Sequence, residues 1–394
     1  MDWPMECRTL EPFEPLEQKG VAFPVDVTSP MTAADVVHGD LENLSADLAE
    51  DFPRLSGKRL LITGGAGFLG YYLVQGVLHW NNHHNEGDPV DLVVYDNFIR
   101  GLPEWLENLE DDPALTLLKH DIVNPPPADI GDVDFLIHAA SIASPIFYRE
   151  YPIETMDANV IGFRHLLEYA KAQAEKGKPL ESFLFYSTSE IYGDPDPDNI
   201  PTPETYRGNV SCTGPRACYD ESKRYGETLA VNFAKQHGLP IVTARPFNNY
   251  GPGLNINDGR VLPDFARNIF NGEDIVLLSD GSATRTFCYI SDSIAGYYRI
   301  LFRGRPGEAY NIGTEKPEIS MSYLADTVAK LGSEQHGWAG QVVKGVSDDP
   351  EYLTDNPNRR CPIIAKARDE LGYEPKVTFE EGIERSLAWY SGNR

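Results

Sequence analysis

The segment RLLITGGAGFLG, residues 59–70, decides the fold class of this chain. It begins as a short apolar run typical of a buried strand, and Gly64, Gly67 and Gly70 then follow in GxxGxxG spacing. The next residues, YYLVQGVLHW, have the composition of a helix. Glycines between a strand and a helix allow a tight turn and bring backbone N–H groups close to a pyrophosphate. We therefore expect a dinucleotide-binding turn here.

An acidic residue at the end of the next strand-like run supports this interpretation. Asp96 closes DLVVYD, a position where a carboxylate hydrogen-bonds the ribose 2′-hydroxyl of NAD and repels the 2′-phosphate of NADP. The polar insert NNHHNEGD, residues 81–88, explains why Asp96 lies farther along the chain than usual. NAD is thus the expected cofactor. Arg100 offers the alternative, since a nearby arginine can accommodate a 2′-phosphate.

Strand-like and helix-like segments alternate over residues 58–250. Short β-branched-rich runs such as DFLIHAA, SFLFYS and PIVTAR are separated by helix-length stretches such as IGFRHLLEYAKAQAEKG. This alternation is typical of a parallel sheet covered by helices on both faces. We expect an α/β protein with a Rossmann doubly wound NAD-binding domain at 58–250. A smaller α/β substrate-binding domain is expected at 251–394, discontinuous, with some segments returning to the first domain.

Residues 1–57 form an N-terminal extension ahead of the Rossmann pattern. About the first 30 residues are acidic and interrupted by prolines, and we expect a surface-draped or poorly structured arm. Residues 31–51 follow a helical pattern, with Thr32 and Asp35 in capping-box-like spacing. The apolar stripe of this helix is expected to dock on the main body, with partner binding as the alternative. The stripe consists of Val37, Leu41, Leu44 and Leu48.

Composition excludes several classes of function. The chain has 394 residues with 60 Asp and Glu against 34 Lys and Arg, so its net charge of -26 argues against binding nucleic acid or anionic lipid. No apolar run is long enough for a membrane span, and the acidic N-terminus does not resemble a signal peptide. The five cysteines lack paired spacing, which indicates a reducing, cytoplasmic location. His79, His83 and His84 are interpreted as solvated, and no metal site is expected.

Tyr219 and Lys223 in ACYDESKR are candidates for a catalytic pair. Their spacing of four places both side chains on one helix face. A phenol with a pKa near ~10 is a poor base at neutral pH, and a neighbouring ammonium is expected to lower that pKa. The pair follows the cluster YSTSE, with Thr188, Ser189 and Glu190, by about thirty residues. Downstream of a dinucleotide turn, we interpret the pair as catalytic rather than as ordinary helix surface.

Together these motifs resemble the extended short-chain dehydrogenase/reductase family, and within it the UDP-glucuronate decarboxylases. The resemblance rests on the glycine turn and on HAASIASPIFYREYPIETMDANVIG, YSTSEIYGDP, TGPRACYDESKR, ARPFNNYGP, NDGRVLPDF, GSATRTFCYISD and YNIG, in the family's order. It covers nearly everything from Lys58 onward. It implies an NAD-dependent lyase that converts a UDP-glucuronate-like sugar nucleotide to a UDP-xylose-like pentose through a 4-keto intermediate.

The resemblance also implies roles for individual residues. Catalytic roles are implied for Thr188, Ser189, Glu190, Tyr219, Lys223 and Arg285. Contacts with NAD are implied for Gly64, Gly67, Phe68, Leu69, Asp96, Asn97, Asp121, Ile122, Ala139, Ala140, Tyr219 and Lys223. Contacts with the nucleotide sugar are implied for Tyr148, Glu190, Asn248, Arg260 and Arg285, with Glu190 and Arg285 at the C5–C6 end of the sugar.

The two residues after Thr188 distinguish related chemistries within this resemblance. The 4,6-dehydratases have Asp-Glu there, because expelling a 6-hydroxyl needs an acid and a base, and simple 4-epimerases usually have no carboxylate. Ser189-Glu190 supplies one carboxyl, which suits loss of CO₂ from C5. A 4-epimerase, a 4,6-dehydratase and a non-catalytic nucleotide-binding scaffold remain the alternatives.

The resemblance further implies a homodimer that pairs the helix of Tyr219 with the helix after Asn159. The apolar residues expected to exceed the needs of one core are Leu166, Leu167, Leu229 and Phe233. Ile142, Gly253 and the insertion EYLTDNPNRRCP depart from the family pattern. Because of these departures, the sequence specifies the type of reaction better than it specifies the nucleotide base or the sugar of the substrate.

Overall fold

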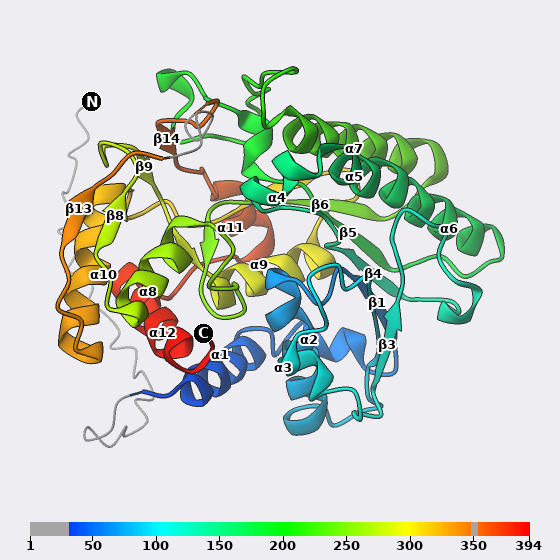
Figure 1. The fold of residues 1–394 in the computed structure, drawn as a ribbon. Coiled ribbons are helices and arrows are strands. Elements are labelled where there is room, and N and C mark those ends of the chain that lie inside the picture. Colours follow the sequence, from blue (N-terminus) through cyan, green and yellow to red (C-terminus); the bar gives the residue numbers. More distant parts are fainter. Residues whose placement is uncertain (1–30, 348–353) are drawn as a thin grey trace, which may run out of the picture. The chain divides into compact units, whose positions relative to one another are not determined.

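Seven parallel strands form the central sheet of the computed structural model, which describes residues 31–347 and 354–394. Their order is β11, β6, β5, β4, β1, β2, β3, which is the Rossmann order with β11 added at one edge (Figure 1). The bounds are β1 Arg59–Thr63, β2 Asp91–Asp96, β3 Leu115–Lys119, β4 Phe135–His138, β5 Ser182–Tyr186, β6 Ile241–Pro246 and β11 Ala309–Ile312. The predicted doubly wound sheet is confirmed, and β11 is a strand that the alternating pattern does not reveal.

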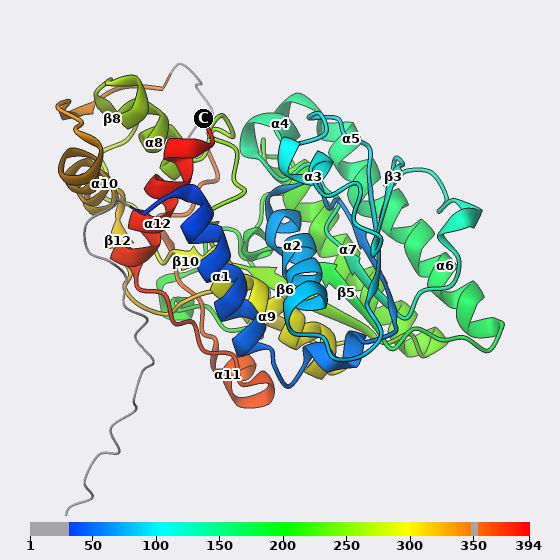
Figure 2. The same cartoon turned by 90° about the horizontal axis from the view of Figure 1, so that it is seen from below.

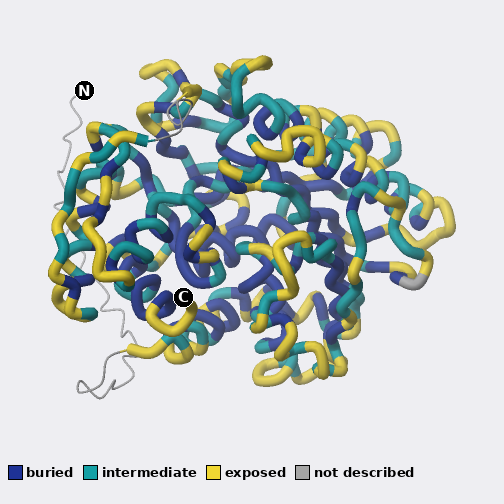
Figure 3. The backbone as a smooth tube through the Cα atoms, in the orientation of Figure 1, coloured by how far each residue is buried: buried dark blue, intermediate teal, exposed yellow. Residues whose placement is uncertain are grey.

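Both faces of this sheet are buried. Leu60 and Ile62 of β1 lie in one hydrophobic core, while Leu61 between them lies in the other. Helices α2 (Phe68–His83) and α9 (Ile290–Arg303) cover the first face, and α6 (Phe163–Glu175) and α7 (Ala217–His237) cover the second. Apart from the partly exposed edge strand β3, the strands therefore read as largely continuous apolar runs, because little of either face meets solvent. Figure 3 shows them mostly in the colour of buried residues.

The predicted N-terminal helix is α1, Ala33–Asp47, and it docks on the main body as expected. Its capping box is present, since Thr32 Oγ1 accepts from the Asp35 N–H and the Asp35 carboxylate accepts from the Thr32 N–H. Leu41, Leu44 and Leu48 are buried and Val37 is half-buried. The helix packs on α2, α9 and α12 (Phe379–Gly392), as Figure 2 shows. The predicted arm that precedes it lies outside the described residues.

The elements after residue 250 are mostly short. Helices α8 (Val261–Asn271), α10 (Met321–His336) and α12 pack on one another, and α11 (Ala365–Leu371) packs on α9 and β11. The small sheets pair β7 (Asn249–Tyr250) with β10 (Cys288–Tyr289), β8 (Ile275–Leu277) with β13 (Val342–Lys344), and β9 (Thr284–Arg285) with both β12 (Ile319–Ser320) and β14 (Arg359–Arg360). Among the described residues, no helix combines the length and the apolar composition that crossing a membrane requires.

Short helical segments lie between the longer elements of the first 200 residues. They are η1 (Phe52–Leu55), α3 (Glu104–Glu107), η2 (Ala128–Ile130), α4 (Pro145–Glu150), α5 (Pro152–Asp157), the π-helical turn η3 (Ala158–Gly162), η4 (Ser189–Tyr192) and η5 (Pro197–Asn199). Of these, η4 carries the predicted Ser-Glu pair, and α4, α5 and η3 pack against one another or α7.

The apolar residues assigned from sequence to a subunit contact do not form a surface. Leu166, Leu167 and Phe233 are buried in the second core, and Leu229 is packed against it. The reason is that α6 and α7 already use these residues to cover the sheet. Other large apolar side chains are exposed on the neighbouring segments instead, namely Ile153, Met156, Ile161 and Tyr225.

Candidate active site

One cavity of about 1810 Å³ is lined by every residue predicted above to touch the cofactor or the sugar. It opens where β1, β2, β4, β5 and β6 end, so residues such as Gly64, Asp96, Ala139 and Ser187 form its wall. The carboxyl edge of a doubly wound sheet is where ligands bind in such folds. The far wall comes from α8, β9 and the segment 354–360.

The glycine turn has the shape that a dinucleotide pyrophosphate needs. Gly64 has φ +73°, and a Cβ there would lie 2.5 Å from the backbone of Ala140. A Cβ at Gly70 would lie 2.1 Å from the carbonyl oxygen of Gly65, so glycine is needed for the close packing of α2 on the turn. Gly67 caps α2 without a side chain, which leaves the first N–H groups of the helix open to the cavity.

The next strand ends in a position that favours NAD. The carboxylate of Asp96 accepts hydrogen bonds from the Ala66 N–H at 3.2 Å and the Phe98 N–H at 2.9 Å, so it is fixed beside the glycine turn. Arg100 instead donates to Asp258 at 3.0 Å, and its guanidinium lies over the ring of Phe147. Because Arg100 is paired with Asp258, it is not available to bind a 2′-phosphate, which would meet only the carboxylate of Asp96. The residues present therefore fit NAD.

Tyr219 and Lys223 face the cavity from α7, one helical turn apart. The phenol of Tyr219 is hydrogen-bonded to Thr188, and its ring is stacked on that of Tyr148, with centroids 5.1 Å apart. Lys223 Nζ donates to the carbonyl of Tyr186 at 2.9 Å. Burial lowers the pKa of Lys223 to about 7.

The expectation that Lys223 lowers the pKa of Tyr219 is wrong for this arrangement. Burial raises the pKa of Tyr219 to about 12, although the hydrogen bond from Thr188 acts in the opposite direction. The ammonium of Lys223 lies 5.8 Å from the centre of the Tyr219 ring. At that distance its charge does not offset the loss of solvent around the phenol.

Glu190 is clamped between two arginines. Arg360 makes two hydrogen bonds with its carboxylate, one of them at 2.6 Å, and Arg216 makes a third. Burial alone would raise the pKa of Glu190, but the two guanidinium groups outweigh it and hold the pKa well below its usual range. Glu190 is therefore ionised, with its charge more than balanced by its neighbours.

The other residues predicted for the sugar line the same cavity. Arg285 donates to the carbonyls of Thr284 at 2.7 Å and Asn358 at 3.1 Å, and burial lowers its pKa to about 9. Asn248 donates to the carbonyl of Thr286 at 2.9 Å. Arg260 pairs with Asp258 at 3.1 Å. These contacts fix the side chains of Arg285, Asn248 and Arg260, which all line the cavity.

Sequence reasoning missed the two arginines of the clamp. Arg216 stands in the quoted motif TGPRACYDESKR, and Arg360 stands in the insertion before the last helices. It also missed Asp220, which is buried next to Tyr219 and whose carboxylate lies 3.8 Å from Arg216 Nε. Burial and the charge of Glu190 raise the pKa of Asp220 well above its usual range. For Asp220 the available signal was Arg216 four residues earlier, at the N-cap of the same helix, whereas the sequence around Glu190 contains no basic residue.

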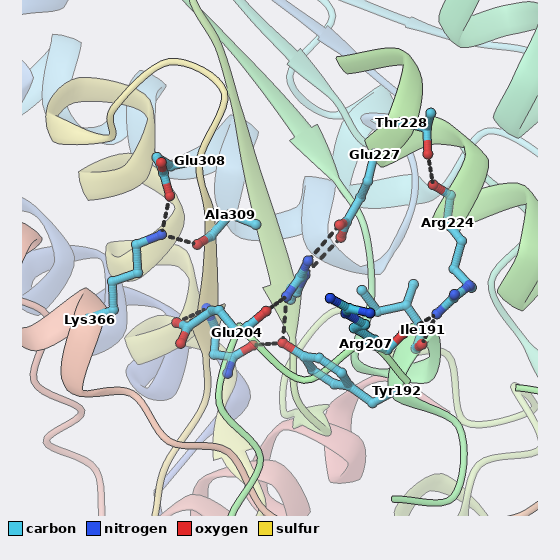
Figure 4. A network of polar contacts seen from close by, with 12 residues as sticks. Ile191, Tyr192, Glu204, Arg207, Arg224, Glu227, Thr228, Glu308, Ala309 and Lys366 are labelled. Atoms are coloured by element: carbon cyan, nitrogen blue, oxygen red, sulfur yellow. Dashed lines mark hydrogen bonds and ion pairs between the residues drawn. The ribbon is translucent and has the colours of Figure 1, made fainter. Parts of the chain in front are cut away.

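A polar network behind the cavity holds the turn that carries Glu190 (Figure 4). Arg224 of α7 donates to the carbonyl of Ile191 at 2.8 Å. The hydroxyl of Tyr192 donates to Asn311 of β11 at 2.7 Å and accepts from Arg245 at 2.7 Å. The turn η4 is thus fixed from α7, β6 and β11, so the position of Glu190 depends on packing outside the cavity.

Comparison with known proteins places the chain among nucleotide-sugar enzymes. Residues 60–313 match the model of the NAD dependent epimerase/dehydratase family. The chain is 40% identical over 325 residues to UDP-glucuronic acid decarboxylase 3 of Arabidopsis thaliana, covering 82% of this chain and 86% of that protein. It is 33% identical over 359 residues to UDP-glucuronic acid decarboxylase 1 of Xenopus tropicalis, covering 89% and 77%.

Solved structures show the same fold. The dTDP-glucose 4,6-dehydratase of Streptomyces venezuelae, determined with NAD bound, has a TM-score of 0.72 and 26% identity, covering 85% of this chain and 98% of that one. The UDP-glucuronic acid 4-epimerase of Bacillus cereus, determined with UDP-glucuronic acid and NAD, has a TM-score of 0.67 and 25% identity, covering 85% and 99%.

Proposed function

Because the chain belongs to the NAD-dependent epimerase/dehydratase family, we propose that it is an NAD-dependent decarboxylase of a nucleotide sugar. Its substrate is a UDP-glucuronate-like uronate, and its product is a UDP-xylose-like pentose formed through a 4-keto intermediate. The relatives named UDP-glucuronic acid decarboxylases, which match more than four fifths of the chain, support this choice.

The observation that carries the proposal is the environment of Glu190. A dehydratase needs an acid that protonates a leaving hydroxyl, but Glu190 is held ionised by Arg216 and Arg360. Its neighbour Ser189 is not ionisable. The cationic groups around it, including Arg285, suit a substrate with a carboxylate at C6.

Tyr219 and Thr188 perform the proton transfer at the 4-hydroxyl. When bound, NAD supplies the acceptance and return of hydride at C4 of the sugar. Tyr219 takes the proton of the 4-hydroxyl, and Thr188 aligns the phenol for this transfer. Tyr219 needs its pKa of about 12 lowered for this role, and a cation bound beside it would do so. Lys223 and Asp96, which line the cavity, would hold the two riboses of the cofactor.

The arginine-rich end of the cavity promotes loss of CO₂. Once C4 is a ketone, the C5–C6 bond breaks and its electron pair moves to the C4 oxygen, where Tyr219 donates a hydrogen bond to the enolate. A proton from water then adds to C5. Tyr219 returns its proton to the C4 oxygen as the carbonyl is reduced back to an alcohol by the hydride that the bound cofactor would give back. Arg285, Arg216 and Arg360 orient the carboxylate, and Glu190 keeps the latter two in place.

Product analysis tests this function directly. The enzyme is incubated with UDP-glucuronate and NAD, and we expect a UDP-pentose by mass spectrometry with CO₂ in equal amount. A product of unchanged mass would establish the epimerase, and loss of water would establish the dehydratase. Tyr219→Phe should lower the rate ~10²–10⁴-fold. Tyr323→Phe, an exposed tyrosine of α10 that does not line the cavity, is the control and should keep it.

We also propose that the protein is a cytoplasmic homodimer. The exposed apolar side chains Ile153, Met156, Ile161 and Tyr225, on α5, η3 and α7, support a subunit contact across these helices. The location is supported by the cysteines of the described residues, Cys212, Cys218, Cys288 and Cys361, which are free thiols.

A further inference from the structure

Two neighbouring helices bring four histidines and one glutamate together on the side of the molecule that carries α1. Helix α1 contributes His38 and Glu42, which are four residues apart. Helix α2 contributes His79 and His83, also four apart, and His84 follows directly as its C-cap. Spacing of four places both members of each pair on one helix face. None of the five lines the catalytic cavity.

The approach of the two helices fixes this cluster. A Cβ at Gly76 of α2 would lie 2.7 Å from the side chain of Leu44 in α1, so the absence of a side chain lets the helices pack closely. Buried Asp40 of α1 accepts hydrogen bonds from Tyr72 at 2.6 Å and Tyr289 at 2.7 Å. Figure 2 shows α1 and α2 side by side. The ligand atoms are therefore positioned by contacts outside the cluster.

Three of these side chains converge. His79 Nε2 lies 2.9 Å from one carboxylate oxygen of Glu42, and His84 Nε2 lies 3.2 Å from the other. These atoms lie within 4.8 Å of one another. The His83 ring is 4.5 Å from that of His79, and the His38 ring is 5.9 Å from it. Ligands of tetrahedral zinc are separated by about 3.3 Å, as metal–ligand bonds of ~2.0–2.1 Å require.

The interpretation of His79, His83 and His84 as solvated surface residues fails for His79. Its side chain is only 8% exposed, because it lies in the contact between α1 and α2. The side chains of His84 and Glu42 are 37% and 41% exposed, which leaves a path for an ion from solvent. The three ligand groups converge on one point. They are one buried imidazole, one accessible imidazole and one carboxylate, which together form a ligand set for a divalent metal.

We propose that His79, His84 and Glu42 bind a divalent transition-metal ion, with Zn²⁺ as the ion their chemistry suits. Imidazole and carboxylate ligands favour zinc over calcium or magnesium, which prefer oxygen ligands alone. Water completes the coordination, and His38 and His83 surround the site. The net charge of -26 raises the local concentration of cations at the surface.

The ion has a structural role at this position. It joins α1 to α2, the first helix of the Rossmann sheet, whereas α1 lies outside the segment 60–313 that matches the family. A metal that binds only the folded arrangement stabilises it by mass action. The consequence is that the metal strengthens the attachment of the N-terminal helix to the nucleotide-binding sheet.

The experiment uses the tag-free, full-length protein after chelation and dialysis. Titration with ZnCl₂ in a calorimeter should show one saturable site per chain, and thermal unfolding should shift to higher temperature. Co²⁺ in place of Zn²⁺ should give the visible absorption of a four-coordinate site. His84→Ala and Glu42→Gln change accessible side chains, so they are expected to fold. Each should weaken Zn²⁺ binding ~10-fold or more and remove the thermal shift.

His237→Ala is the matched control, because His237 lies at the end of α7, outside the cluster. It should bind Zn²⁺ as the unmodified protein does. The proposal is overturned if micromolar Zn²⁺ gives no saturable binding. It is equally overturned if His84→Ala and Glu42→Gln bind the ion with unchanged affinity, because the ion then lies elsewhere. Circular dichroism of the metal-free variants checks that each one folds.

Discussion

At the residue scale, the charge state of Glu190 depends on residues far from it in sequence. Arg216 lies 26 positions away and Arg360 lies 170 positions away, yet both contact its carboxylate. A carboxylate with two guanidinium partners stays ionised, because protonation would leave both cations without a counter-charge. We therefore expect Glu190 to act by its charge and by holding the two arginines, and not by releasing a proton.

Glu190→Gln tests this role with a nearly isosteric side chain. Without the charge, Arg216 and Arg360 lose the group that positions them, and we expect CO₂ release to slow ~10²-fold or more. Oxidation at C4 should continue, so NADH and a 4-keto sugar accumulate. Stopped-flow absorbance of NADH, recorded together with CO₂ release, measures both steps. Glu221→Gln, a partly exposed position on α7, is the control.

Two other results of the Glu190→Gln experiment would contradict this role, each in a different way. Full CO₂ release without accumulation of NADH would mean that Glu190 no longer supports the proposal that the protein is a decarboxylase. A parallel fall of both steps with a lower melting temperature would mean that Glu190 only fixes the turn η4.

Lys223 gives a second residue-scale prediction, about stability and pH. Burial lowers its pKa to about 7, whereas an unfolded lysine titrates near ~10.4. Between these values the unfolded chain holds a proton that the folded protein lacks. The free energy of unfolding therefore rises with pH, by up to ~1.4 kcal/mol per pH unit from this group.

Urea denaturation of Lys223→Met across this pH window measures the contribution. The variant has no titrating group, so its stability relative to the unmodified protein should fall as pH rises from about 7. Lys235→Met replaces an exposed lysine of the same helix and should show no such trend. A constant difference between Lys223→Met and the unmodified protein would contradict the lowered pKa.

At the element scale, α1 is held by buried side chains and by ion pairs. Leu44 packs against Gly76 of α2. Asp47 at the end of the helix accepts from Arg299 of α9 at 3.0 Å. Asp51 just after it pairs with Arg303 at 2.7 Å. The helix is therefore part of the hydrophobic core and not a loose appendage.

Leu44→Ala should consequently destabilise the whole protein. Leu44 is 2% exposed, and removing such a side chain leaves a cavity that costs ~2–5 kcal/mol in the free energy of unfolding. Val37→Ala, at a half-buried position of the same stripe, should cost less. Chemical denaturation measures both. Equal, small effects would show that α1 contributes little to the cooperative unit.

At the scale of the whole molecule, the subunit contact that we propose uses a different set of residues than the sequence indicated. The sheet takes Leu166, Leu167 and Phe233 into its second core. Tyr225 of α7 remains 50% exposed and Ile153 of α5 remains 63% exposed. The exposed apolar side chains of α5, η3 and α7 are therefore the ones that we propose contact a second copy of the chain.

Light scattering at micromolar concentration should report a dimer for the unmodified protein. Tyr225→Asp places a charge in the proposed contact and should shift the mass toward the monomer. Val346→Asp is the control, because Val346 is 90% exposed and lies between β13 and the undescribed segment. A monomeric unmodified protein, or equal behaviour of both variants, would contradict the dimer.

The amino-acid sequence by itself determined the features that depend on neighbours along the chain. The alternation of short apolar runs with helix-length stretches predicted the Rossmann sheet, the glycine spacing predicted the turn at Gly64, and the spacing of four predicted the shared face of Tyr219 and Lys223. Each of these follows from local geometry, since backbone conformation fixes where side chains i+2, i+3 and i+4 point.

Only the tertiary structure decided which distant charges meet. It paired Glu190 with Arg360, brought His79 to Glu42, and placed β11 beside β6. It also raised the pKa of Tyr219, which the local pattern predicted would fall. Desolvation and Coulomb interactions depend on distance through space, and one sequence without a fold does not specify that distance.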